Sequence, residues 1–187
     1  EKVTPEIINF MSKKGRGLIC CSLDENRCES LGLDLMVGKN TDNFNTSFTV
    51  SVDLKGKGVS TGISVKDRSK TIQALVNNDT KISDLSKPGH VFPLKAMDGG
   101  VLRRAGHTEA SLDFAKISGL KPSGVLVEIL NDDGSMARLP DLKKVALKYK
   151  ICLVSIKDLI SFRLKSESLI KREIEVKLPT AYGNFKL

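Results

Sequence analysis

Apolar residues recur at helical spacing in several segments, and each segment opens on residues that favour a helix start. The first follows Thr4-Pro5-Glu6, which supplies a capping hydroxyl, a proline suited to the first turn and an acid near the positive end of the helix. Ile7, Phe10 and Met11 then form one stripe that we expect to be buried. Further helices are predicted to begin at Asp24, Ser64, Thr108, Pro140 and Ser155.

Other segments are patterned as strands. Short apolar runs occupy 18–23 and 124–130, and Phe48, Val50 and Val52 alternate with polar residues. Strands are also predicted at 151–156 and 172–178. Because strands and helices interleave along 187 residues, the sequence predicts one domain of α/β or mixed α+β class, with a mixed sheet layered with helices.

The charge balance favours an anionic partner, since 30 Lys and Arg stand against 22 Asp and Glu and the formal net charge is +8. Nucleic acid is the first candidate. The basic residues are scattered, however, Trp is absent, and only seven Phe and two Tyr are available to stack on bases. We therefore expect no nucleic acid partner, which leaves a phosphorylated metabolite or an acidic surface.

The sequence predicts a cytoplasmic protein. No apolar run approaches the roughly 20 residues needed to cross a bilayer, so we expect no membrane partner. The first ten residues contain no basic start followed by an apolar stretch, so nothing indicates a secretory signal. The four cysteines form no CxxC pair and are interpreted as reduced thiols: Cys20, Cys21, Cys28 and Cys152.

The segment from Arg104 to Thr108 (Arg-Ala-Gly-His-Thr) has the composition of a phosphate site. A helix start offers unpaired N–H groups and a partial positive charge, and Gly106 lets a ligand approach the backbone. Arg104 can add a forked, charge-assisted pair of hydrogen bonds. The alternative, that Thr108 merely caps the helix and Arg104 faces water, is equally compatible with the spacing.

Two histidines, a glutamate and a cysteine are further candidates for chemistry. The sequence has two histidines, His90 and His107, and each lies beside glycine; a lone histidine is nevertheless more often a surface or core residue. Glu128 interrupts an apolar strand, where burial would raise its pKa towards useful acid–base values, unless an edge strand exposes it. Cys20 or Cys21 is a candidate reactive thiol, although a buried, inert cysteine is the commoner outcome.

Two other motifs have simpler explanations. Asp132 and Asp133 suggest a metal ligand pair, but a turn before Gly134 explains them as well and is preferred. The glycines of KGKGVSTG do not follow the order of a phosphate-binding P-loop.

Several motifs occur together in the order found in one enzyme family. They are GLIC, GVSTGIS followed by Asp67-Arg68, PGHVFPL, GGVLRRAGHTEA and KPSGVLVEILNDDGSMAR. On these motifs the chain, over about residues 1 to 165, resembles the 3,4-dihydroxy-2-butanone 4-phosphate synthases. The resemblance implies conversion of D-ribulose 5-phosphate to L-3,4-dihydroxy-2-butanone 4-phosphate and formate in riboflavin biosynthesis, with Mg²⁺ or Mn²⁺. It also implies a mixed sheet layered with helices and a homodimer with active sites near the interface.

The same resemblance assigns roles to residues. His107 matches the histidine metal ligand, and His90 and Glu128 match the two positions essential for catalysis. Cys20 and Thr61 match residues that line the pocket, Cys20 as a catalytic candidate and Thr61 as a substrate contact. The substrate-binding set that the resemblance implies is Arg104, Ala105, Gly106, His107, Thr108, Glu128 and Thr61.

The ends of the chain depart from the family pattern or extend it. The family carries an acidic Arg-Glu-x-Glu-Gly-Asp stretch before the helix that begins here at Thr4, and this chain starts at Glu1, so we expect a truncated chain with little activity alone. EVKLPTAYGNFKL resembles the opening of GTP cyclohydrolase II. We therefore expect a synthase domain at 1–170, and at 171–187 a linking strand and the possible start of a fused second domain.

Two other functions are compatible with the class. One is a nucleotide- or RNA-binding α/β module, which would need a continuous basic groove that the scattered lysines do not indicate. The other is an inactive paralogue, in which His90, Arg104, His107 and Glu128 would be free to drift, although all four are present.

Overall fold

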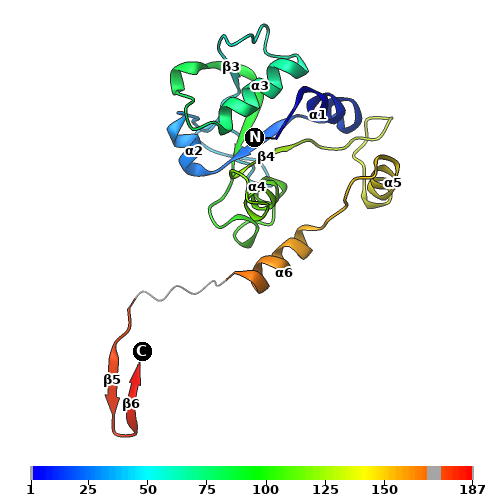
Figure 1. The fold of residues 1–187 in the computed structure, drawn as a ribbon. Coiled ribbons are helices and arrows are strands. Elements are labelled where there is room, and N and C mark those ends of the chain that lie inside the picture. The colour runs from blue at the N-terminus through cyan, green and yellow to red at the C-terminus, as the bar shows by residue number, and fades with distance from the viewer. Residues whose placement is uncertain (1, 168–173, 187) are drawn as a thin grey trace.

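The computed structural model describes residues 2–167 and 174–186, and its centre is a four-stranded mixed sheet (Figure 1). The strand order is β2-β3-β1-β4. β1 and β3 run parallel, whereas β2–β3 and β1–β4 are antiparallel. The α/β class with a mixed sheet is thus confirmed. The strands are β1 Cys20–Leu23, β2 Val52–Leu54, β3 Leu85–Lys95 and β4 Ser123–Leu126.

Helices surround this sheet and continue beyond it. α1 and α3 pack together, while α4 packs on β4 and β1 (Figure 1). The main apolar core includes Ile8, Leu23, Ile72, Leu75 and Val91, all nearly inaccessible to solvent. The helices are α1 Pro5–Phe10, continued by a π-helix Met11–Gly15, α2 Glu25–Ser30, α3 Val65–Val76, α4 His107–Ile117, α5 Leu139–Tyr149 and α6 Ile156–Ser166, with 3₁₀ turns at Ile82–Asp84 and Gly100–Leu102.

The helix starts follow the capping residues of the sequence. The hydroxyls of Thr4, Ser64 and Ser155 each accept a hydrogen bond from the backbone N–H three residues on, as predicted. The helix expected from Thr108 begins one residue earlier, at His107, with Gly106 as its N-cap. His107 therefore stands on the first turn of α4, where backbone N–H groups lack helical partners.

The stripe expected on the first helix is wrong. Ile7 and Phe10 are 44% and 39% exposed, and Ile8 is the residue that is fully buried. The helix widens into a π-helix from Met11 onward. The spacing of three to four residues on which the stripe was based therefore does not continue.

Two strand expectations also fail. Between Phe48 and Val52 the buried side chains include Thr49 and Ser51, because the Thr49 hydroxyl donates to the Pro93 carbonyl. Residues 151–155 are an exposed extended segment without strand pairing, so their apolar run did not indicate a buried strand. The strand expected at 172–178 lies partly outside the described residues.

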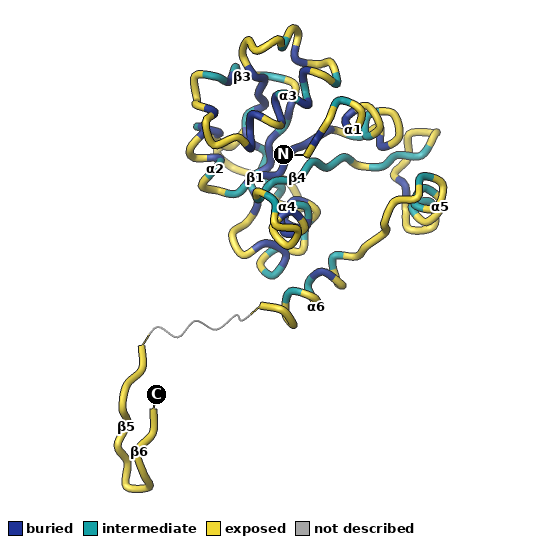
Figure 2. The backbone as a smooth tube through the Cα atoms, in the orientation of Figure 1, coloured by how far each residue is buried: buried dark blue, intermediate teal, exposed yellow. Residues whose placement is uncertain are grey.

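The C-terminal elements contribute little to the core. The backbone from α5 onward is mostly exposed or half-buried, in contrast to the buried strands of the sheet (Figure 2). β5 Lys177–Thr180 and β6 Gly183–Lys186 form an antiparallel hairpin whose residues are all exposed. Among the described residues, no helix has the length and apolar character needed to span a membrane.

Candidate active site

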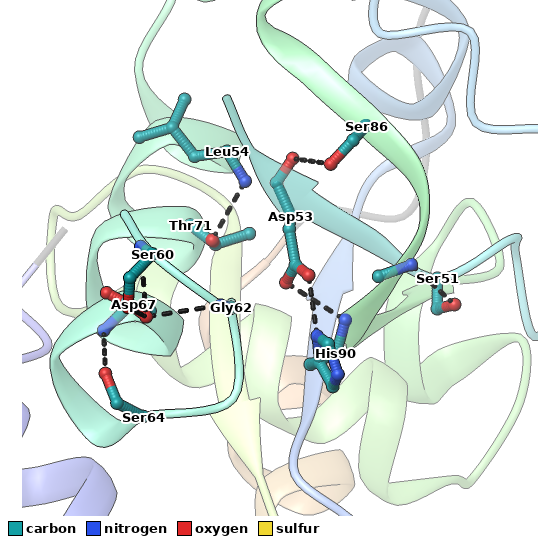
Figure 3. A network of polar contacts seen from close by, with 11 residues as sticks. Ser51, Asp53, Leu54, Ser60, Gly62, Ser64, Asp67, Thr71, Ser86 and His90 are labelled. Carbon is teal, nitrogen blue, oxygen red and sulfur yellow. Dashed lines mark hydrogen bonds and ion pairs between the residues drawn. The ribbon is translucent and has the colours of Figure 1, made fainter. Parts of the chain in front are cut away.

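His90 lies on β3 and is held by a buried carboxylate that the sequence analysis missed. Asp53, on β2, accepts a hydrogen bond from the His90 backbone N–H at 3.0 Å and contacts Nδ1 of the ring at 2.7 Å (Figure 3). Because a carboxylate only accepts, Nδ1 carries the proton and Nε2 is left for a ligand. A Cβ at Gly89 would lie 2.0 Å from the Val52 carbonyl carbon, so glycine permits this close strand approach. Gly89 was therefore the residue in the sequence that could have indicated the close approach of β2 to His90.

Thr61 lies in a loop that is fixed next to Asp53. The buried Asp67 carboxylate accepts hydrogen bonds from the Ser60 N–H and hydroxyl and from the Gly62 N–H (Figure 3). Burial raises the pKa of Asp67, but these hydrogen bonds outweigh it and leave the pKa below its ordinary value. A Cβ on Gly62 would be 2.1 Å from Asp53 Oδ2, so the loop is packed against the partner of His90. The Thr61 side chain itself is exposed.

Glu128 is exposed, so the expectation of a sheltered carboxylate is wrong. β4 ends at Leu126, and the alternation that predicted burial ends with it. Glu128 is nevertheless positioned: its Oε2 accepts a hydrogen bond from the Leu18 N–H at 3.0 Å, and its carbonyl accepts from the Gly17 N–H at 3.1 Å. A Cβ on Gly17 would lie 2.6 Å from the Glu128 carbonyl oxygen and 2.6 Å from Glu128 Oε2, so this approach requires glycine.

The strand register brings His90 and Glu128 to one end of the sheet. Cys20 pairs with Phe92 in parallel and with Leu126 in antiparallel register. His90 lies on β3 two residues before the partner of Cys20, and Glu128 lies two residues after the end of β4. Before β1 the pairing with this segment shifts by one residue, since Arg16 bridges Ile129 and the Gly17 N–H donates to the Glu128 carbonyl. Neighbouring strands lie about 4.8 Å apart, so the backbones of β3 and β4, on either side of β1, are separated by roughly 10 Å.

Cys20 is the first residue of β1, at the same end of the sheet, and is 2% exposed. Burial, together with the negative charge of Glu128, raises the pKa of the Cys20 thiol to about 12. The thiol is therefore neutral at neutral pH and lacks the thiolate needed for nucleophilic attack. Cys21, on the opposite face, is also buried, with a pKa raised to about 11. Cys20 is suited to line the site rather than to react.

His107 and Glu128 line one pocket of about 470 Å³. Its other walls come from β4, from Met136 and Arg138 in the segment that leads into α5, and from Leu142 of α5 itself. His107 is exposed on the first turn of α4, whereas Thr108 beside it is buried. The structure thus brings together an imidazole and a carboxylate that are 21 positions apart in the sequence.

Arg104 does not reach this pocket. Its guanidinium donates to Glu109 Oε2 at 2.6 Å and to the Phe44 carbonyl at 2.8 Å, and it lines a separate pocket with Lys95 and Asp98. The two terminal nitrogens expected to bind phosphate are therefore occupied by a carboxylate and by a backbone carbonyl. Of the remaining residues of the 104–108 segment, Ala105 is exposed and Gly106 is half-buried.

The described residues do not by themselves complete a metal site. Over 2–167 and 174–186, no group of three or more His, Cys, Asp or Glu side chains is arranged to hold an ion. Mg²⁺ prefers six oxygen ligands, and His107 with Glu128 offers one nitrogen and one carboxylate. Asp132 and Asp133 are engaged elsewhere, Asp132 with Arg16 and Asp133 with Ser135, as a turn explains.

An α/β domain with a mixed sheet, and with a histidine and a carboxylate at one end of that sheet, is the class that these observations define. The family model described as 3,4-dihydroxy-2-butanone 4-phosphate synthase matches residues 1–162. The chain therefore belongs to the 3,4-dihydroxy-2-butanone 4-phosphate synthase family, which confirms the resemblance seen in the sequence.

Curated relatives match over the full chain. A riboflavin biosynthesis protein RibBA from Cytophaga hutchinsonii is 65% identical over 187 residues, covering 100% of this chain and 46% of that protein. A 3,4-dihydroxy-2-butanone 4-phosphate synthase from Photobacterium phosphoreum is 53% identical, covering 100% of this chain and 51% of the relative. The chain thus spans about half the length of the curated relatives it matches.

Solved structures share the fold. RibBX from A. baumannii, a two-domain 3,4-dihydroxy-2-butanone 4-phosphate synthase, superposes with a TM-score of 0.87 at 43% identity, covering 98% of this chain and 54% of that chain. A 3,4-dihydroxy-2-butanone 4-phosphate synthase in complex with two magnesium ions superposes with a TM-score of 0.85 at 36% identity, covering 89% of this chain and 82% of that chain.

Proposed function

We propose that the chain is the catalytic part of a lyase that converts D-ribulose 5-phosphate to L-3,4-dihydroxy-2-butanone 4-phosphate and formate. Family membership supports the reaction class. The observation that carries the proposal for this chain is that the sheet brings His90 and Glu128 to the same end, with His107 in the same pocket as Glu128. A nucleotide- or RNA-binding module has no such observation in its favour.

The roles that we propose follow from how each side chain is held. The reaction removes protons next to a carbonyl. Glu128 accepts the Leu18 N–H with Oε2, and the carboxylate has lone pairs left to take such a proton. His90 has its Nδ1 fixed by Asp53, so its Nε2 can bind or protonate a substrate hydroxyl. Cys20 and Thr61 would form the walls around the reacting carbons.

The phosphate would bind at the start of α4. Its first N–H groups, at His107 and Thr108, are available to an anion, and the positive end of the helix favours one. Arg104 would contribute by exchanging Glu109 for phosphate oxygens, with Ala105 and Gly106 keeping the backbone accessible. A net charge of +8 also favours an anionic substrate.

We also propose that the enzyme uses Mg²⁺ or Mn²⁺, with His107 as a ligand. Such an ion supplies stabilisation of negative charge on substrate oxygens when it is bound. Because the described residues do not complete its coordination, the oxygen ligands would have to come from elsewhere: the substrate, a second subunit, or chain outside these residues.

The wider setting is proposed on the same basis. We infer a homodimer, a cytoplasmic location that fits the free cysteines, and a fused GTP cyclohydrolase II domain after a synthase domain at 1–170. The RibBA relatives are about twice as long as this chain, as such a fusion requires.

Formate release from ribulose 5-phosphate tests the proposal. The full-length protein should release formate from ribulose 5-phosphate in a Mg²⁺-dependent manner, and a chelator should abolish the release. If the full-length protein with Mg²⁺ binds ribulose 5-phosphate but never releases formate, the proposed reaction is wrong.

A further inference from the structure

Residues 97–106 form the loop that joins the end of β3 to the start of α4. This loop contains the 3₁₀ turn Gly100–Leu102 and Arg104, and it ends directly before His107. Its conformation therefore decides where the proposed phosphate and metal contacts lie. The loop is held by two carboxylates, Glu109 and Asp113.

Both carboxylates lie on α4, one helical turn apart. Glu109 is 1% exposed and accepts the Met97 N–H at 2.9 Å and the Arg104 guanidinium at 2.6 Å. Asp113 is 2% exposed and accepts the Val101 N–H at 2.8 Å. Glu109 therefore holds the beginning of the loop and Arg104, whereas Asp113 holds its 3₁₀ turn.

The counter-ion of Asp113 comes from a distant element. The Nη1 nitrogen of Arg163, on α6, donates to Asp113 Oδ2 at 2.8 Å and to the Gly99 carbonyl at 2.9 Å. A small apolar cluster joins the same elements, since Val101 of the loop packs with Leu159 of α6. α6 is thus attached to the 97–106 loop through both charge and apolar contact.

We propose that Asp113 and Arg163 form a positioning pair that fixes the 97–106 loop, so that α6 sets the affinity of the site for its sugar phosphate. The inference rests on the proposed function. Asp113 and Arg163 contact neither His90 nor Glu128, which lie on β3 and beyond β4. Loosening the pair should therefore misplace the substrate-binding segment and leave the proton-transfer groups in position.

The test compares Arg163→Gln with Glu167→Gln in the full-length protein. Glu167 also pairs with Arg163, through Nε and the other terminal nitrogen, but does not contact the loop. Arg163→Gln should raise KM for ribulose 5-phosphate about tenfold with kcat within about twofold, while Glu167→Gln leaves KM unchanged. Asp113→Asn should raise KM similarly, and the double variant Asp113→Asn/Arg163→Gln should add little more.

Amide hydrogen exchange supplies a readout that does not depend on turnover. Exchange across 97–106 should quicken in Arg163→Gln and stay unchanged in Glu167→Gln. An unchanged KM, or equal exchange in the two variants, overturns the positioning role while formate release by the parent protein keeps the proposed function intact. A parent protein without formate release instead refutes the proposed function, and the exchange comparison still decides whether the pair holds the loop.

Discussion

His90 and Glu128 lie at the same end of the sheet, yet the protein holds them in opposite ways. His90 is oriented by a buried carboxylate through two contacts, and the loop that carries Thr61 packs against that carboxylate. Glu128 is exposed and accepts a single hydrogen bond from Leu18 through its side chain. The His90 side is therefore organised in advance, whereas the Glu128 side, with His107, is open and has room for additional ligands.

Among the variants that disturb how a side chain is positioned, the one that removes the charge orienting His90 should lower kcat the most. Asp53→Asn is expected to lower kcat about 100-fold, because the amide can present a donor to Nδ1 and so change the tautomer. Ser86→Ala is the matched control, since Ser86 donates to the Asp53 carbonyl and not to its carboxylate. Steady-state formate release measures both variants. Equal kcat in Asp53→Asn and the parent would show that Asp53 does not orient a working imidazole.

Disturbing the Glu128 side should cost less, because this side is less constrained. Gly17→Ala places a methyl group 2.6 Å from Glu128 Oε2, which must then move, and we expect kcat to fall about tenfold. Gly38→Ala is the control, because a Cβ there meets nothing within 4 Å. Parallel kinetics on the two variants make the comparison, and a silent Gly17→Ala would mean that the Leu18 contact does not position Glu128.

The Thr61 loop adds a pH-dependent contribution to stability. The pKa of Asp67 is lowered in the folded protein, so its contribution is present above the ordinary carboxyl pKa and is lost as the pH falls through the lower, folded value. Asp67→Asn should therefore lower the Tm at pH 7, and the difference in Tm between variant and parent should shrink as the pH falls below the ordinary Asp pKa of about 3.9. Thermal melts across this range measure the difference, and a constant gap would contradict the assignment.

Thiol reactivity is the smallest effect and separates the core from the C-terminal part. Cys20, Cys21 and Cys28 are buried with raised pKa values, whereas Cys152 is exposed. At pH 8 a thiol reagent such as Ellman's should modify one cysteine rapidly and the other three only after denaturation. Cys152→Ser should abolish the rapid phase. A rapid phase that survives would show that the sheet opens readily in solution.

Much of this fold could be predicted from sequence because its signals are local. Capping hydroxyls marked three helix starts, and apolar runs marked β1 and β4. The exposure of Glu128 could not be predicted, since it depends on where the chain leaves the sheet after Leu126. Asp53 gave no signal either, because its role arises only from pairing between β2 and β3.

The candidate residues came from motifs, but their arrangement did not. The sequence suggested that Arg104 and His107 act side by side, whereas the structure pairs Arg104 with Glu109 and places His107 in the same pocket as Glu128. Glycines were the overlooked signal. Gly17 and Gly89 each mark a place where backbone from a distant segment approaches too closely for a side chain.

The central claim is that Glu128 moves the proton next to the substrate carbonyl. Glu128→Gln keeps an oxygen to accept the Leu18 N–H but removes the base, so it isolates that role. In the full-length protein with Mg²⁺, we predict that exchange of the substrate's carbon-bound hydrogen with solvent deuterium, followed by NMR, falls at least about 100-fold while ribulose 5-phosphate still binds. Exchange at the parent rate in Glu128→Gln would contradict the account.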